Sequence, residues 1–129
     1  MASRSSSSND RPAPNAGVFR GRPGGEIAVV GLGKSGRSVS TLLARDGHHV
    51  YASDAGTSDA AKASAAALES LGVATDVGRH DLERIARAAL VVASPGVPPD
   101  APPLAAAARG SVPIVGEIEI ALHYVPGLK

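Results

Sequence analysis

The segment Gly31-Leu32-Gly33-Lys34-Ser35-Gly36 holds three glycines in the spacing Gly-x-Gly-x-x-Gly. An apolar run at 27–30 precedes it and an amphipathic segment follows it, so a buried strand should turn here into a helix. The N-terminus of a helix carries free backbone N–H groups and a partial positive charge, which suit a phosphate or a diphosphate. The sequence therefore predicts a diphosphate-binding loop at Gly33, Lys34, Ser35 and Gly36. The alternative is a tight strand-to-helix turn without a ligand.

Lys34 and Ser35 follow Gly33 as the last residues of an ATP-binding P-loop would. Such a loop also needs a glycine five positions before Gly33, because its backbone wraps the phosphates from both sides. This chain has Ala28 at that position. No ATP site is expected in this loop.

Asp54 ends the second apolar run of the sequence, and the small residues Ala55 and Gly56 follow it. In dinucleotide-binding proteins an acid about 20 residues beyond the glycine loop binds ribose hydroxyls. A carboxylate here could equally accept a hydrogen bond from a base or cap the following loop. Ala55 and Gly56 leave the backbone open to a ligand, so all three residues are candidates for binding.

A third turn of the same kind, Ser94-Pro95-Gly96, follows the apolar run 90–93. Proline stiffens the turn, glycine permits a close approach to the backbone, and Ser94 offers a hydroxyl. An ordinary turn is the alternative for this segment taken alone. Three such turns that all follow apolar strands favour one ligand site at the edge of a sheet.

Apolar runs that alternate with amphipathic segments predict an α/β domain in which a parallel sheet is covered on both faces. We expect a doubly wound, Rossmann-like sheet of about five strands, at 27–30, 49–53, 73–77, 90–93 and 112–115. The third is expected at the edge because it contains Thr75 and Asp76. Helices are expected at 37–46, from a cap at Thr57 or Ser58 to Leu71, at 81–89, at 102–110 and from 116 onward.

Composition excludes several classes of protein. The chain of 129 residues has no cysteine, 2% aromatic residues and a formal net charge of +1. These values argue against a disulfide framework, a thiolate metal site and a nucleic-acid-binding surface. No apolar run approaches the roughly 20 residues of a membrane span, and no secretory signal is visible, so a cytoplasmic protein is expected.

Residues 1–25 are rich in Ser, Pro, Gly and Arg, which predicts a disordered leader, with a transit peptide as the alternative. Residues 26–129 would then form one domain. The four histidines are scattered, and Glu117 and Glu119 are two apart on an expected helix and so point in different directions. The sequence therefore predicts neither a metal site nor a catalytic residue.

Four segments, in this order, resemble the N-terminal domain of the Mur ligases, and most closely that of the MurD branch of the family. They are Val30 to Gly36, Ser53-Asp54, Val92 to Val97 and Ile114 to Glu119. The Ser-Pro-Gly turn and the Gly-Glu-Ile-Glu segment carry most of the specificity. Together the segments extend over nearly the whole of the predicted domain.

The resemblance implies that the domain binds the uridine diphosphate end of UDP-N-acetylmuramoyl-L-alanine. Lys34 and Ser35 would lie at the diphosphate, Asp54, Ala55 and Gly56 beside the uracil and ribose, and Ser94, Pro95 and Gly96 across the same pocket. Members of the family commonly have Thr or a similar polar residue where this chain has Ala55. That difference leaves the contact with the base to Asp54 and the backbone.

The resemblance also implies a central domain that uses ATP and Mg²⁺ and a C-terminal domain that binds D-glutamate. Neither is expected within this chain, which should therefore act as a monomeric binding domain without cofactor and without ligase activity alone. Two other functions stay open on the residues themselves. One is the NAD(P)-binding domain of an oxidoreductase, and the other is a nucleotide-sensing module.

Overall fold

The computed structural model describes residues 25–123. The predicted leader lies outside these residues except for Gly25, so its disorder stays a prediction. The described chain forms a sheet of five parallel strands in the order β3-β2-β1-β4-β5. The strands are β1 Ile27–Val30, β2 Val50–Asp54, β3 Ala74–Val77, β4 Leu90–Ala93 and β5 Ile114–Gly116.

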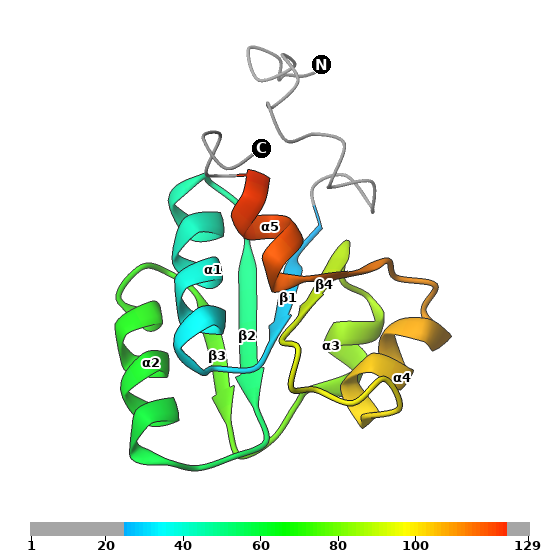
Figure 1. Ribbon diagram of the computed structural model, residues 1–129, viewed down its shortest axis with the longest axis horizontal. Helices are drawn as coiled ribbons and strands as arrows, with labels where there is room; N and C mark the ends of the chain where they lie inside the picture. Colours follow the sequence, from blue (N-terminus) through cyan, green and yellow to red (C-terminus); the bar gives the residue numbers. More distant parts are fainter. Residues whose placement is uncertain (1–24, 124–129) are drawn as a thin grey trace.

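A helix follows each strand, so that strands and helices alternate along the chain. The helices are α1 Lys34–Arg45, α2 Asp59–Glu69, α3 Leu82–Ala86, α4 Pro102–Arg109 and α5 Glu117–His123. Figure 1 shows α1, α2 and α5 on one side of the sheet and α3 and α4 on the other. The prediction of a doubly wound, Rossmann-like α/β domain is confirmed, and β3 lies at an edge as expected.

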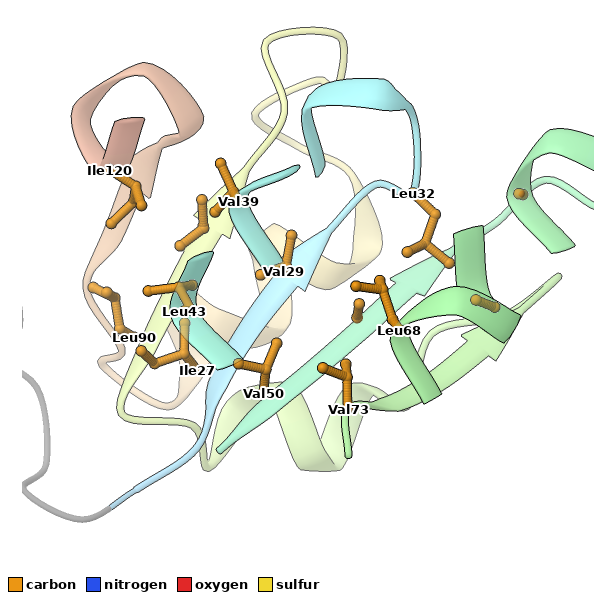
Figure 2. Close-up of a cluster of buried hydrophobic side chains, with 14 residues drawn as sticks. Ile27, Val29, Leu32, Val39, Leu43, Val50, Leu68, Val73, Leu90 and Ile120 are labelled. Carbon is orange, nitrogen blue, oxygen red and sulfur yellow. The ribbon is translucent and has the colours of Figure 1, made fainter. Parts of the chain in front are cut away.

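The two faces of the sheet bury different sets of strand residues, because successive side chains of a strand point to opposite sides. Ile27 and Val29 of β1 pack on the side of α1, α2 and α5, whereas Ala28 and Val30 pack on the side of α3 and α4. Figure 2 shows Val29 of β1 beneath Val39 of α1. Both faces are apolar, which explains why the central strands β1 and β4 are continuous apolar runs in the sequence.

Several elements differ by a few residues from their predicted bounds, and three of the differences have a clear cause. Helix α1 begins at Lys34 and not at Arg37, because the first turn of a helix is recognised by its cap and not by apolar periodicity. Helix α3 ends at Ala86 rather than Ala89, since the N–H of Ala89 donates to the carbonyl of Glu26 just before β1 and so cannot continue the helix. The predicted fifth strand begins too early, because the N–H of Val112 donates to the carbonyl of Ala107 and closes the end of α4.

Candidate functional site

The carboxyl ends of three neighbouring strands meet at one edge of the sheet. Val30 of β1 is in register with Ser53 of β2 on one side and with Ala93 of β4 on the other. The residues that follow these three are Gly31, Asp54 and Ser94. The chain leaves β1 toward β2 and later returns to β4, so this edge is the topological switch point at which open α/β sheets bind ligands.

The glycine loop needs glycine at two positions for different reasons. Gly31 has a φ of +113°, which residues with a side chain rarely adopt. Gly36 packs so closely on the loop that a Cβ added there would lie 2.0 Å from the carbonyl oxygen of Gly31. Helix α1 thereby starts directly against the end of β1, which is the close packing that this motif exists to permit.

The N-terminus of α1 is left without an anionic partner from its own segment. Its N-cap, Gly33, provides no side-chain hydrogen bond, and its first turn contains no acidic residue. Lys34 and Ser35 are exposed. The free N–H groups of this turn can therefore donate hydrogen bonds to a phosphate group.

Leu32 holds the glycine loop in place through both its side chain and its backbone. Its side chain is 1% exposed and belongs to the core beneath α1 and α2, where Figure 2 shows it near Leu68. Its backbone N–H donates to Oδ2 of Asp54 over 2.7 Å. A loop held by both a buried side chain and a hydrogen bond is preorganised for a ligand.

The Asp54 carboxylate accepts hydrogen bonds from the backbone of two loops, and such capping is one of the alternatives that the sequence left open. Besides Leu32, the N–H of Gly56 donates to its Oδ1 over 2.7 Å. Each carboxylate oxygen keeps a further lone pair, so these two contacts leave room for a ligand donor. Asp54 therefore joins the glycine loop to the turn after β2 and still borders the site.

A cavity of about 280 Å³ opens at the switch point, on the side of α4. We call it the switch-point cavity. Three predicted binding residues, Asp54, Ala55 and Gly96, contribute to its lining together with Gly31. The rest of the lining consists of Val30, His80, Val97, Pro98, Ala101, Pro102 and Pro103. A flat, largely apolar ring fits such a cavity better than a charged group does.

His80 belongs to this site, although the sequence indicated only a scattered histidine. Its Nδ1 lies 2.7 Å from the hydroxyl oxygen of Ser53, a side chain that is fully buried. Burial lowers the pKa of His80 from 6.5, and the charges of Asp54 and Asp76 oppose that shift. The signal that could have identified it is position, because His80 comes shortly after the carboxyl end of β3 at this same edge.

A second cavity, of about 570 Å³, lies on the opposite side of the glycine loop between α1 and α5. Three predicted residues, Lys34, Ser35 and Pro95, line this α1–α5 cavity and not the switch-point cavity. Ser94 instead packs against the glycine loop, with its Cβ 3.1 Å from where a Cβ on Gly31 would stand. The predicted residues thus surround the loop on two sides, and their roles in binding stay a prediction.

Within residues 25–123, no three His, Asp or Glu side chains gather closely enough to hold a metal ion. No helix in this part of the chain is long and apolar enough to cross a bilayer. The arrangement can therefore bind and orient a ligand through N–H groups, a fixed carboxylate and an apolar cavity.

Comparison with known proteins agrees with this description. Residues 25–116 match the family model of the Mur ligase MurD-like N-terminal domain. The chain is 39% identical over 104 residues to the UDP-N-acetylmuramoylalanine–D-glutamate ligase of Acidobacterium capsulatum, covering 81% of this chain and 23% of that protein. It is 42% identical over 105 residues to the ligase of the same name from Anaeromyxobacter dehalogenans, covering 81% of this chain and 22% of that protein.

Among solved structures, the UDP-N-acetylmuramate-alanine ligase MurC of Thermotoga maritima matches with a TM-score of 0.61 and 23% identity. The match covers 81% of this chain and 24% of that one. At this identity the likeness supports the fold alone. Because the family model matches most of the described residues, the chain belongs to the family of MurD-like N-terminal domains of the Mur ligases.

Proposed function

We propose that this domain binds the uridine diphosphate end of UDP-N-acetylmuramoyl-L-alanine. The observation that carries the proposal is the meeting of Gly31, Asp54 and Gly96 around one cavity, with the uncapped N-terminus of α1 across the glycine loop from it. An apolar cavity next to a phosphate-binding helix end is complementary to a nucleobase joined to a diphosphate.

Each part of the ligand then has a partner in the domain. The N–H groups at Lys34, Ser35 and Gly36 would bind the diphosphate. The exposed ammonium group of Lys34 would lie at the mouth of the glycine loop. The uracil would lie in the switch-point cavity between the backbone of Gly31 and the prolines at the start of α4. Pro102 and Pro103 have no backbone N–H group. This wall of the cavity can therefore contact the uracil ring but donates no hydrogen bond that would compete for the phosphates.

The chain spans less than a quarter of the length of the relatives named above. We propose ligase activity, with D-glutamate as second substrate and a cytoplasmic location, only for a protein that joins this domain to the remaining parts of such an enzyme. The residues described here do not fit ATP and Mg²⁺, because the glycine loop has Ala28 where a P-loop requires glycine. We therefore propose that ATP is bound elsewhere and that this chain alone is inactive.

An NMR titration of the 129-residue chain tests the proposal. UDP should shift the amide signals of Gly33 to Arg37 and of the residues around Asp54 and His80, whereas ATP should leave them in place. A shift with NAD and none with UDP would instead favour the cofactor domain of an oxidoreductase.

Two variants on helix α1 form a matched pair for the same titration. Lys34 is exposed in the first turn of the helix, and Arg45 is exposed in its last. Lys34→Ala should weaken UDP binding by roughly threefold to tenfold, the loss of one exposed charge contact. Arg45→Ala removes an equal charge at the far end and should leave the affinity unchanged. Equal effects of the two substitutions would argue against a diphosphate at this helix end.

A further inference from the structure

The carboxylate of Glu117, the first residue of α5, is buried without a hydrogen-bond partner. The residue is 3% exposed, and neither side-chain oxygen has a donor among the described residues. A carboxylate removed from water in this way is unfavourable unless another charge or dipole stabilises it. The carboxylate should therefore be stabilised by a nearby charge or dipole with which it makes no hydrogen bond.

The N-terminus of α1 supplies such a dipole close by. Oε2 of Glu117 lies 3.3 Å from where a Cβ on Gly36 would stand, in the first turn of that helix. Glu117 also lines the α1–α5 cavity together with Lys34 and Ser35. The first turn of α1 has no acidic residue of its own, so Glu117 supplies a negative charge from another part of the chain.

We propose that Glu117 is the counter-charge of the α1 N-terminus and that it thereby limits the affinity of this helix end for a diphosphate. The inference rests on the proposed function, because it concerns the same ligand. The positive end of the helix is shared between the carboxylate and the phosphates when the ligand is bound. The carboxylate stabilises the loop when no diphosphate is bound and makes a bound diphosphate easier to release.

The repulsion between the Glu117 carboxylate and a bound diphosphate should be measurable as a change in the affinity for that ligand. Like charges roughly 10 Å apart, at an effective dielectric constant of about 20, repel strongly enough to change Kd on the order of tenfold. The effect should grow with the number of phosphate charges and vanish for a ligand without phosphate. This dependence separates a charge effect from a general loosening of the site.

The experiment compares Glu117→Gln with Glu119→Gln in the 129-residue chain. Both substitutions remove one negative charge from α5, but Glu119 is exposed and its Oε1 accepts a hydrogen bond from the N–H of Gly116. Calorimetry measures the Kd of UDP, UMP and uridine for each chain in EDTA at low salt. Thermal unfolding establishes that each variant is folded, and Glu117→Ala provides a second variant if Glu117→Gln is not.

Glu117→Gln is expected to bind UDP about tenfold more tightly than the unsubstituted chain, UMP by a smaller factor, and uridine equally. Glu119→Gln should bind all three ligands as the unsubstituted chain does. The inference is overturned if Glu117→Gln binds UDP equally or more weakly. It is also overturned if adding Mg²⁺ makes that variant the weaker binder, since Glu117 would then be a ligand of a cation.

Inorganic pyrophosphate keeps the two proposals apart. If the unsubstituted chain fails to bind UDP, the proposed function fails, but the inference about Glu117 still predicts tighter pyrophosphate binding by Glu117→Gln. If UDP binds and Glu117→Gln has no effect on either ligand, the inference alone fails.

Discussion

The carboxylate of Asp54 accepts a hydrogen bond from the backbone N–H of Leu32, with 2.7 Å between Oδ2 and the nitrogen. This contact joins the turn after β2 to the glycine loop after β1, the two turns that the sequence predicted to face one ligand. The other oxygen of the same carboxylate accepts from the N–H of Gly56. Asp54 therefore holds the site together before any ligand arrives.

The first prediction follows from this double contact. Asp54→Asn replaces one acceptor oxygen by an NH₂ group, so that either Leu32 or Gly56 loses its acceptor. Leaving such a donor unpaired should lower the free energy of unfolding by about 1–3 kcal/mol, as measured in urea. Asp100→Asn is the control, because Asp100 is exposed in the loop before α4 and should unfold as the unsubstituted chain does. An equally small change in both variants would contradict a structural role for Asp54.

The glycine loop allows a second comparison, between two of its glycines. Gly36→Ala would place a Cβ 2.0 Å from the carbonyl oxygen of Gly31, whereas Gly33→Ala would meet no atom within 4 Å. Gly36→Ala should therefore cost about 3 kcal/mol or more, because backbone atoms cannot move aside as a side-chain end can. Gly33→Ala should stay within about 1 kcal/mol of the unsubstituted chain. Thermal or urea unfolding of the two variants measures the difference, and a similar loss in both would be the contrary result.

Much of the fold could be predicted because the central strands β1 and β4 are short apolar runs and several connections contain a recognisable turn or cap. Gly47 and Gly72 both take a positive φ after helices, where the sequence predicted helix ends. Ser58 and Asp81 accept hydrogen bonds from the N–H groups of Ala61 and Arg84, as N-caps do. Local patterns of this kind need no knowledge of the tertiary fold.

The site was only partly predictable, because its missing members are defined by contacts that are distant in sequence. His80 is fixed by Ser53, and Glu117 lies beside Gly36, across separations that no local pattern reveals. Their importance depends on burial, which changes a common polar residue into a costly one. The sequence also could not show that Lys34 and Asp54 border different cavities, since that depends on which side of the loop each turn packs.

His80 gives a prediction about acid stability. Burial lowers its pKa below 6.5, so at pH values just under 6.5 the unfolded chain binds a proton that the folded chain does not. The free energy of unfolding should therefore fall as the pH falls below 6.5, and His80→Gln should flatten that part of the profile. Urea unfolding over this range measures the slope, with His49→Gln as the control at an exposed histidine. A slope that persists in His80→Gln would assign it to another group.

Tyr51 gives the corresponding prediction in alkali. Its hydroxyl donates to Oδ2 of Asp76 over 2.6 Å and accepts from the N–H of Asp81, while the guanidinium of Arg84 lies 4.6 Å from its ring. Burial, followed by the hydrogen bond to Asp76, raises the pKa of Tyr51 to about 12 from 10.0. The folded chain therefore keeps a proton that the unfolded chain releases above pH 10.

The stability that this hydroxyl contributes should be complete below pH 10 and decline as the pH rises toward 12. Tyr51→Phe removes the hydroxyl and leaves the N–H of Asp81 without this acceptor, at a cost of about 1–2 kcal/mol near neutral pH. As the pH rises above 10, the unsubstituted chain should lose up to about 2–3 kcal/mol relative to the variant. Urea unfolding of both chains at a series of alkaline pH values measures this difference. A constant gap between the two chains would show that the phenol of Tyr51 ionises alike in the folded and unfolded states.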